Sequence, residues 1–340
     1  MGRVVVKCLR QLDPKLKVTV ADRREPSSLP RGVRFAKVNL MHHAGLVKLL
    51  RRHSVVINST SHHFNLPVMC AALAAKIHYL DLGGLFHYTR KQLKFHDAFR
   101  KKGLTAVLGM GCAPGVANVL AAWGARKFDQ LDEIHIKVGS RSWAPPSDAI
   151  PYAVGTIREE LTWLPAVYEG KRWIFKPAMS GKESFPFPAP VGKQPIFRTI
   201  HSEVATLPRS FPGVKSCSFK IGFPDVMIDA VLHPRRHRYT AHGSAGPAAR
   251  DIETTVALLR GRVGKKKRAL LACCEVKSKG DHGSGDWDTA WPPAIVARMI
   301  ARGEIRERGV FPPEKVVPID AFIATLRKKA GFRVFQVKAR

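Results

Sequence analysis

The sequence predicts an α/β protein with an open parallel sheet in its first third and a second, α+β domain after it. Five short apolar runs alternate with helical stretches over residues 17–108, a pattern typical of βαβ units. The runs end in Gly, Asn, Ser or Asp, which an open α/β sheet places along its ligand crevice. From Trp143 on, short strands broken by Pro and Gly replace this alternation. A length of 340 residues fits two domains.

The elements follow from the spacing of apolar residues. In the first third we expect strands at 17–21, 33–38, 54–58, 78–82 and 104–108, and helices at 44–52, 66–76 and 89–102. A helix is expected at 114–128, because Pro114 suits a first helical turn. In the second part we expect strands at 132–140, 173–176, 196–200, 216–221 and 268–276, and helices at 148–161, 252–259 and 294–302.

Composition excludes several classes of protein. The hydrophobic fraction of 45% is too high for a disordered chain, and no apolar run is long enough to span a bilayer. The first ten residues lack the apolar core of a signal peptide, so we expect a cytoplasmic protein with no membrane association. Fifty-seven Lys and Arg against 26 Asp and Glu give a net charge of +31. Only 264–268 and 235–238 are dense in cations, without interleaved aromatic residues, so nucleic acid is not an expected partner.

The cysteines and histidines predict no metal site. Six cysteines are scattered without a CxxC pair, so buried thiols are expected, and Cys112 is interpreted as a structural thiol. The pairs His42-His43 and His62-His63 have sequential spacing and no flanking Cys, Asp or Glu pattern, so we expect them at the surface.

The N-terminal region carries part of a dinucleotide-binding pattern. Asp22 ends a predicted strand, where a carboxylate accepts the hydroxyls of an adenosine ribose, and Arg23 and Arg24 follow, where a guanidinium pairs with a 2′-phosphate. Gly2 lies 20 residues before Asp22, the position of the last fingerprint glycine. The expectation is that a first strand and two glycines precede residue 1, and that the sheet otherwise has a gap at its centre with weakened nicotinamide binding.

Several ordered motifs resemble one known family. They are Val56-Ile-Asn-Ser-Thr-Ser61, Phe64-Asn-Leu66, Tyr79-Leu-Asp-Leu-Gly-Gly84, Leu108-Gly-Met-Gly-Cys-Ala-Pro-Gly-Val-Ala-Asn-Val119, Thr199-Ile-His-Ser-Glu-Val-Ala-Thr-Leu-Pro208, Phe219-Lys-Ile-Gly-Phe-Pro224, Pro292-Pro-Ala-Ile-Val296 and Gly309-Val-Phe-Pro-Pro313. Together they resemble the saccharopine dehydrogenase-like NAD(P)-dependent oxidoreductases over nearly the whole chain. Many saccharopine reductases carry Asp before the Pro-Gly of the fourth motif, where this chain has Ala113.

The resemblance implies a Rossmann domain over residues 1–125, a substrate and dimerisation domain over 126–288, and a C-terminal segment over 289–340 that packs back on the first domain. It implies a homodimeric oxidoreductase that uses NADP or NAD and acts on a CH–NH bond of an amino-acid substrate. The arginines after Asp22 favour NADP slightly. A lysine 6-dehydrogenase-like deaminating enzyme and a non-catalytic NAD(P)- or anion-binding protein are the alternatives.

The predicted cofactor contacts follow the strand ends. Asn58, Ser59 and Thr60 end a strand where a nicotinamide ribose would pass, with helix capping as the alternative. Asp81 and Gly83 end the next strand, where Asp81 is a candidate contact or a turn-forming carboxylate. The N–H groups of the glycine-rich segment from Gly109 and Met110 onward are candidates for binding an anion.

The predicted catalytic pair is His201 and Glu203. Placed on a strand, residues i and i+2 share a face, and a His–carboxylate pair forms an acid/base unit with a pKa near neutrality. A surface ion pair is the alternative. Arg198 and Arg209 are candidate partners for a substrate carboxylate.

Overall fold

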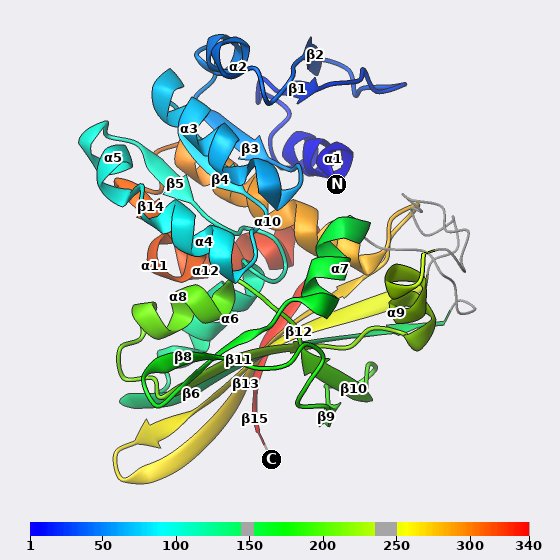
Figure 1. Ribbon diagram of the computed structural model, residues 1–340, viewed down its shortest axis with the longest axis vertical. Helices are drawn as coiled ribbons and strands as arrows, with labels where there is room; N and C mark the ends of the chain where they lie inside the picture. The colour runs from blue at the N-terminus through cyan, green and yellow to red at the C-terminus, as the bar shows by residue number, and fades with distance from the viewer. Residues whose placement is uncertain (144–152, 235–249, 340) are drawn as a thin grey trace.

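The computed structural model, which describes residues 1–143, 153–234 and 250–339, is an α/β structure with two main sheets and a layer of helices between them (Figure 1). This arrangement confirms the predicted fold class. The expected helix at 148–161 appears as α7 (Val154–Thr162), and its first residues, like the cations at 235–238, lie outside the described residues. No helix in the described ranges is long and apolar enough to cross a membrane.

The first sheet has four parallel strands in the order β14-β5-β4-β3. Three of them come from the N-terminal region, and β14 comes from the C-terminal segment, as the expected return of that segment requires. The strands are β3 (Val55–Asn58), β4 (His78–Asp81), β5 (Thr105–Val107) and β14 (Gly309–Phe311). The helices connecting them are α3 (Asn65–Ala75), α4 (Phe86–Leu93) and α5 (His96–Lys101), with the short turn η1 (His62–Phe64) before α3.

The first two strands stand apart from this sheet. β1 (Thr19–Asp22) and β2 (Arg34–Lys37) pair only with each other, in parallel, and α2 (His43–Leu50) follows them. Among the described residues no strand lies between β1 and β3, so the expected gap is present. Helix α1 (Gly2–Leu12) lies beside the gap and packs on α10 (Ser284–Ala301).

The second sheet has nine strands and is mostly antiparallel. Its main order is β15-β13-β12-β6-β11-β10-β9, and off this path β7 pairs with β11 and β8 pairs with β7. β6 and β11 are its parallel pair. The strands are β6 (Gln130–Ser142), β7 (Ala166–Glu169), β8 (Arg172–Phe175), β9 (Glu183–Pro186), β10 (Lys193–Arg198), β11 (Ser216–Ile221), β12 (Asp251–Val263), β13 (Lys266–Lys277) and β15 (Arg333–Lys338).

The expected helix at 252–259 is wrong, because these residues form the middle of β12. This strand pairs along its length with β6 on one side and β13 on the other. A central strand buried on both faces is a continuous apolar run, which periodicity does not separate from a buried helix.

The helices between the two sheets bury one shared core. The largest apolar cluster joins α1 (Val4), β4 (Leu80), β6 (Ile136) and β15 (Val334), so it draws on all three predicted segments of the chain. The remaining helices are α6 (Val116–Ala125), α8 (Glu203–Ser210), α9 (Asp225–Leu232), α11 (Pro313–Val316) and α12 (Ile319–Thr325), with the π-helical turn η2 (Leu326–Ala330). The domain bounds at 125 and 288 stay predictions, and β15 adds that the C-terminal segment also serves the second sheet.

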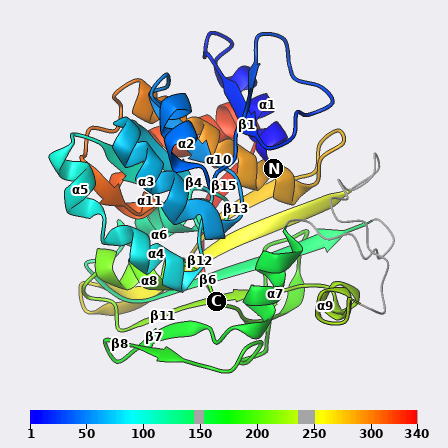
Figure 2. The same cartoon turned by 45° about the horizontal axis from the view of Figure 1, so that its top comes forward.

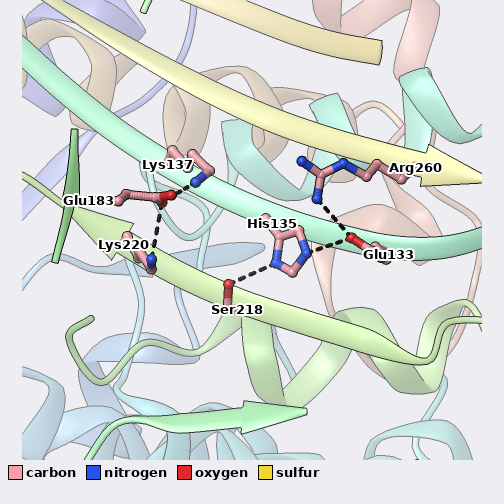
Figure 3. A network of polar contacts seen from close by, with 7 residues as sticks. All are labelled: Glu133, His135, Lys137, Glu183, Ser218, Lys220 and Arg260. Carbon is pink, nitrogen blue, oxygen red and sulfur yellow. Dashed lines mark hydrogen bonds and ion pairs between the residues drawn. The ribbon is translucent and has the colours of Figure 1, made fainter. Parts of the chain in front are cut away.

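The face of the second sheet that points away from the helices carries a polar network (Figure 3). The Lys137 ammonium pairs with the Glu183 carboxylate, and the Lys220 ammonium lies 3.1 Å from the same carboxylate. Glu133 lies 3.1 Å from His135 and 3.0 Å from Arg260 on the neighbouring strand. These ion pairs tie β6, β9, β11 and β12 across the face.

Candidate functional site

A large cavity of about 1530 Å³ runs from the ends of β1 and β3 to the second sheet. Part of this volume is the gap between β1 and β3, which is lined by apolar residues such as Val20 and Val56. At its other end the cavity is closed by α7, β6, β11, β12 and the start of α10. Figures 1 and 2 show α7 standing between the N-terminal elements and the second sheet.

Five predicted cofactor residues line this cavity: Gly2, Asp22, Ser59, Thr60 and Gly83. A Cβ on Gly2 would come within 3.0 Å of the Ser59 Oγ, so the start of α1 lies directly against the loop after β3. A helix N-terminus presents unpaired N–H groups, and such groups favour an anion.

At the end of β1 the two predicted arginines differ in their relation to the cavity. Arg24 lines the cavity, and its backbone N–H donates to the Asp22 carboxylate at 3.1 Å. Arg23 is exposed and is not among the lining residues, so its contact with a cofactor phosphate stays a prediction. The structure favours Arg24 for that contact.

Asn58 and Asp81 are buried supports and do not line the cavity. Asn58 donates to the Asn65 side chain at 2.9 Å and accepts from the Thr60 hydroxyl at 2.7 Å. Asp81 is 0% exposed and accepts four hydrogen bonds, from the Tyr79 hydroxyl, the Gln92 amide and the backbone N–H groups of Gly83 and Gly109. Direct contact of either residue with a ligand is therefore corrected to a positioning role.

Gly109 and Met110 are likewise behind the cavity wall. The Met110 side chain is fully buried, and its backbone N–H donates to the Asp81 carbonyl at 2.8 Å. Gly109 donates to the Asp81 carboxylate at 2.7 Å, so its N–H is not available to an anion. Gly83 does reach the cavity, with a φ of 136° and no room for a Cβ beside the Pro114 ring.

His201 and Glu203 meet as predicted, but not on a strand and not at the surface. His201 precedes α8, Ser202 is its N-cap residue and Glu203 its first residue, and the His201 Nδ1 lies 3.1 Å from the Glu203 carboxylate. His201 stacks on Phe219 and lines the cavity, whereas Glu203 is 0% exposed behind it. The surface ion pair is therefore wrong.

The pKa of His201 departs from the expectation. Burial disfavours its charged form, but the Glu203 and Glu160 carboxylates outweigh burial and raise the pKa of His201 to about 10. The imidazole thus carries a proton at neutral pH. Its Nε2 is buried and lies 3.8 Å from the Glu160 carboxylate.

A second proton-bearing group lies across the cavity. Burial raises the pKa of Glu253 on β12 and of Asp288 on α10, and the neighbouring Glu253 carboxylate raises the pKa of Asp288 further. The Cys112 thiol lies 3.5 Å from Glu253 and 2.9 Å from the Thr255 hydroxyl, and burial raises the pKa of Cys112. A thiol held neutral in this way agrees with a structural thiol.

The two ends of the cavity differ in their charged residues. The end near β1 is lined by the cations Arg3, Lys17 and Arg24 together with the carboxylates Asp22 and Glu25. Among the described lining residues of α7, β6, β11, β12 and the first two turns of α10, there are carboxylates but no Lys or Arg, although Arg298 lines the cavity from the last part of α10. These carboxylates are Glu160, Asp251, Glu253, Asp286 and Asp288, and together we call them the acidic wall.

Sequence reasoning missed the acidic wall. Its residues come from three separate stretches, and Asp251 and Glu253 belong to the segment interpreted as a helix. The available signal was their contrast with a chain of +31 net charge. The two predicted carboxylate partners, Arg198 and Arg209, do not line the cavity, and Arg209 lies over the Trp173 ring.

The histidine pairs differ from each other. His42 and His43 are exposed, as predicted. His62 is only 4% exposed and lies 2.8 Å from Glu159 on α7, so its expected surface position is wrong. The short turn after β3 folds it inward against the second half of the molecule.

A nicotinamide dinucleotide fits these residues. Asp22 and Arg24 offer partners for the ribose and its phosphate, the start of α1 faces the loop with no Cβ between them, and Ser59 and Thr60 continue toward Gly83. The acidic wall begins where this path ends, which leaves the inner part of the cavity for a second molecule.

Comparisons with known proteins also support a nicotinamide cofactor. Residues 1–107 match the saccharopine dehydrogenase NADP binding domain. Carboxynorspermidine synthase from Vibrio cholerae is 25% identical over 341 aligned positions, covering 85% of this chain and 80% of that protein. Carboxyaminopropylagmatine dehydrogenase from Synechocystis sp. is 27% identical over 210, covering 58% of this chain and 52% of that protein. The apo saccharopine dehydrogenase (L-Glu forming) of Saccharomyces cerevisiae shares the fold, with a TM-score of 0.76 at 13% identity over 100% of this chain and 98% of the yeast chain.

The fold, the cavity and the matched domain define an oxidoreductase that uses NADP or NAD. The match over residues 1–107 supports the resemblance to the saccharopine dehydrogenase-like family that the motifs indicated.

Proposed function

We propose that this protein reduces the C=N bond between an amine and a carboxylate-bearing carbonyl compound, or oxidises the resulting CH–NH bond, and that its amine substrate is cationic. The acidic wall is the observation that carries the proposal. In a chain with a net charge of +31, carboxyl groups gathered at the inner end of the cavity favour a substrate with ammonium groups. Glu160, Asp251 and Asp286 carry this argument, because burial raises the pKa of Glu253 and Asp288 and so favours their neutral forms. The names of the two curated relatives, a carboxynorspermidine synthase and a carboxyaminopropylagmatine dehydrogenase, support a substituted amine that also carries a carboxyl group.

The chemistry assigns a proton to this chain. Bound NADPH supplies a hydride to the imine carbon, and the nitrogen takes a proton, so that C=N becomes CH–NH and NADPH becomes NADP⁺. We assign that proton to His201, because it is protonated at neutral pH and lines the cavity. Glu203 orients the ring through Nδ1.

The catalytic prediction concerns this pair. His201→Ala and Glu203→Gln are expected to lower turnover by about 10²–10⁴-fold, the usual contribution of a general acid, with little loss of cofactor affinity. Steady-state turnover and nicotinamide titration on the same preparations test this. Full turnover in both variants would assign the proton to another group, and Asp288→Asn then tests the pair across the cavity.

The substrate class is tested by NADPH oxidation with one carboxylate-bearing aldehyde and a matched set of amines. Diamines and longer polyamines should react with a higher kcat/KM than monoamines of equal length. Glu160→Gln should raise the KM for the diamine, while Glu169→Gln, at the end of β7 and outside the cavity lining, should not. Equal rates with neutral and cationic amines would remove the acidic wall from recognition.

The lysine 6-dehydrogenase-like reaction is the second candidate, supported by the same carboxylates facing an amino group. It predicts NADP⁺ or NAD⁺ reduction by lysine alone, with release of ammonia and no second substrate. The homodimer and the cytoplasmic location also stay proposals, which sedimentation of the purified protein and fractionation of cells test.

A further inference from the structure

We propose that His62, His63 and Glu159 form a binding site for a divalent transition-metal cation, best matched by Zn²⁺, that joins the N-terminal half of the molecule to α7. The His62 Nε2 lies 2.8 Å from one oxygen of the Glu159 carboxylate, and the His63 Nε2 lies 3.0 Å from the other. All three ligand atoms lie within 4.8 Å of one another. Two imidazoles and one carboxylate are a common ligand set for this ion.

The spacing suits an ion between the three groups. Metal–ligand distances of 2.0–2.2 Å in a tetrahedral site separate neighbouring ligand atoms by roughly 3.3 Å. The observed 2.8 Å and 3.0 Å separations therefore need an expansion of only a few tenths of an ångström. Three protein ligands leave one tetrahedral position for water or another ligand.

The buried contact between His62 and Glu159 leaves two polar atoms that a cation can satisfy. The His62 Nε2 and one Glu159 oxygen are buried without hydrogen-bond geometry between them, although they lie 2.8 Å apart. Buried polar atoms normally have a partner, and a cation that binds both atoms supplies one.

The orientation and the exposure of His63 both suit the binding of a metal ion. Its Nδ1 lies 2.7 Å from the Tyr88 hydroxyl, and a proton on Nδ1 leaves the Nε2 lone pair for a cation. His63 is 49% exposed, so an ion can reach the site from solvent. His62 lines the cavity next to Ser61, close to the proposed nicotinamide contacts Ser59 and Thr60.

The test is calorimetric titration of the metal-stripped full chain with ZnCl₂, together with Co²⁺ absorption in the visible range. The wild type should bind one Zn²⁺ at a tight site that Mg²⁺ does not occupy. His63→Ala and Glu159→Gln should each weaken this site by at least about 100-fold, since loss of a supporting partner alone costs 10–100-fold. Tyr88→Phe should weaken it less, by about 10-fold.

The matched control is the double variant His42→Ala, His43→Ala, an exposed sequential pair at the start of α2. It should retain the tight site. Absence of a tight site in the wild type, its persistence in both His63→Ala and Glu159→Gln, or its loss in the control would each overturn the proposal. The readout is metal binding, so it does not depend on the proposed reaction. Because His63 is exposed, we expect the His63→Ala variant to fold, and circular dichroism verifies this.

Discussion

His201 is the residue whose chemistry most depends on its surroundings. Its folded-state pKa of about 10 lies above the roughly 6.5 of an unfolded chain. A raised pKa stabilises the folded state fully below pH 6.5, and this stabilisation is lost as the pH rises through 10. We therefore expect His201→Gln to reduce the free energy of unfolding most at pH 6, with the difference from wild type shrinking between pH 6.5 and 10. Chemical denaturation across this range measures it, and a constant difference would contradict a charged His201.

Cofactor preference also lies at the residue scale. Arg24 lines the cavity beside Asp22, and Arg23 does not. If Arg24 pairs with a 2′-phosphate, Arg24→Ala should weaken NADP binding by about 1–3 kcal/mol, the range of a hydrogen bond to a charged group, and leave NAD binding unchanged. Arg23→Ala is the matched control. Equal effects of the two variants on NADP would remove the distinction that the structure draws between these arginines.

Among the elements, β1 and β2 are the least supported. They form a two-stranded sheet, and a sheet of this size is only marginally stable by itself. A side-chain contact from His53 to Thr19, at 2.9 Å, adds one link to α2. The amides of β1 and β2 should therefore exchange with deuterium faster than those of β4, which is paired on both sides. Equal protection in the two regions would mean that β1 has support beyond its pairing with β2.

The strand β12 shows why a local sequence pattern can predict the wrong secondary structure. Its residues are apolar on both faces because helices cover one side of the sheet and the cluster around Phe187 and Ile196 covers the other. Neither the helices nor this cluster can be recognised from a short stretch of sequence around β12. Once the strand is in place, Glu253 points to the cavity, so the interpretation of this one element decided whether the acidic wall was found.

At the scale of the whole molecule, the shared core predicts cooperative unfolding. One apolar cluster joins α1 (Val4), the four-stranded sheet (Leu80) and the nine-stranded sheet (Ile136). Because neither sheet buries its helix-facing side alone, we expect one transition in denaturant, with coincident midpoints by tryptophan fluorescence and far-UV circular dichroism. Two separated midpoints would show that the sheets unfold as independent domains.

The sequence by itself determined the fold class, the parallel strands from residue 54 to 108, the gap beside β1 and the resemblance to a family of NADP-binding oxidoreductases, because these depend on local periodicity and on ordered motifs. Only the tertiary structure decided which polar residues face the cavity. Asn58 and Asp81 end neighbouring strands in equivalent positions and are both buried, with Asp81 holding Gly83 and Gly109, whereas Ser59, one residue beyond Asn58, lines the cavity. The acidic wall and the cluster of His62, His63 and Glu159 combine residues far apart in the chain. Their proximity is created by packing between the two halves, and no spacing along the sequence encodes it.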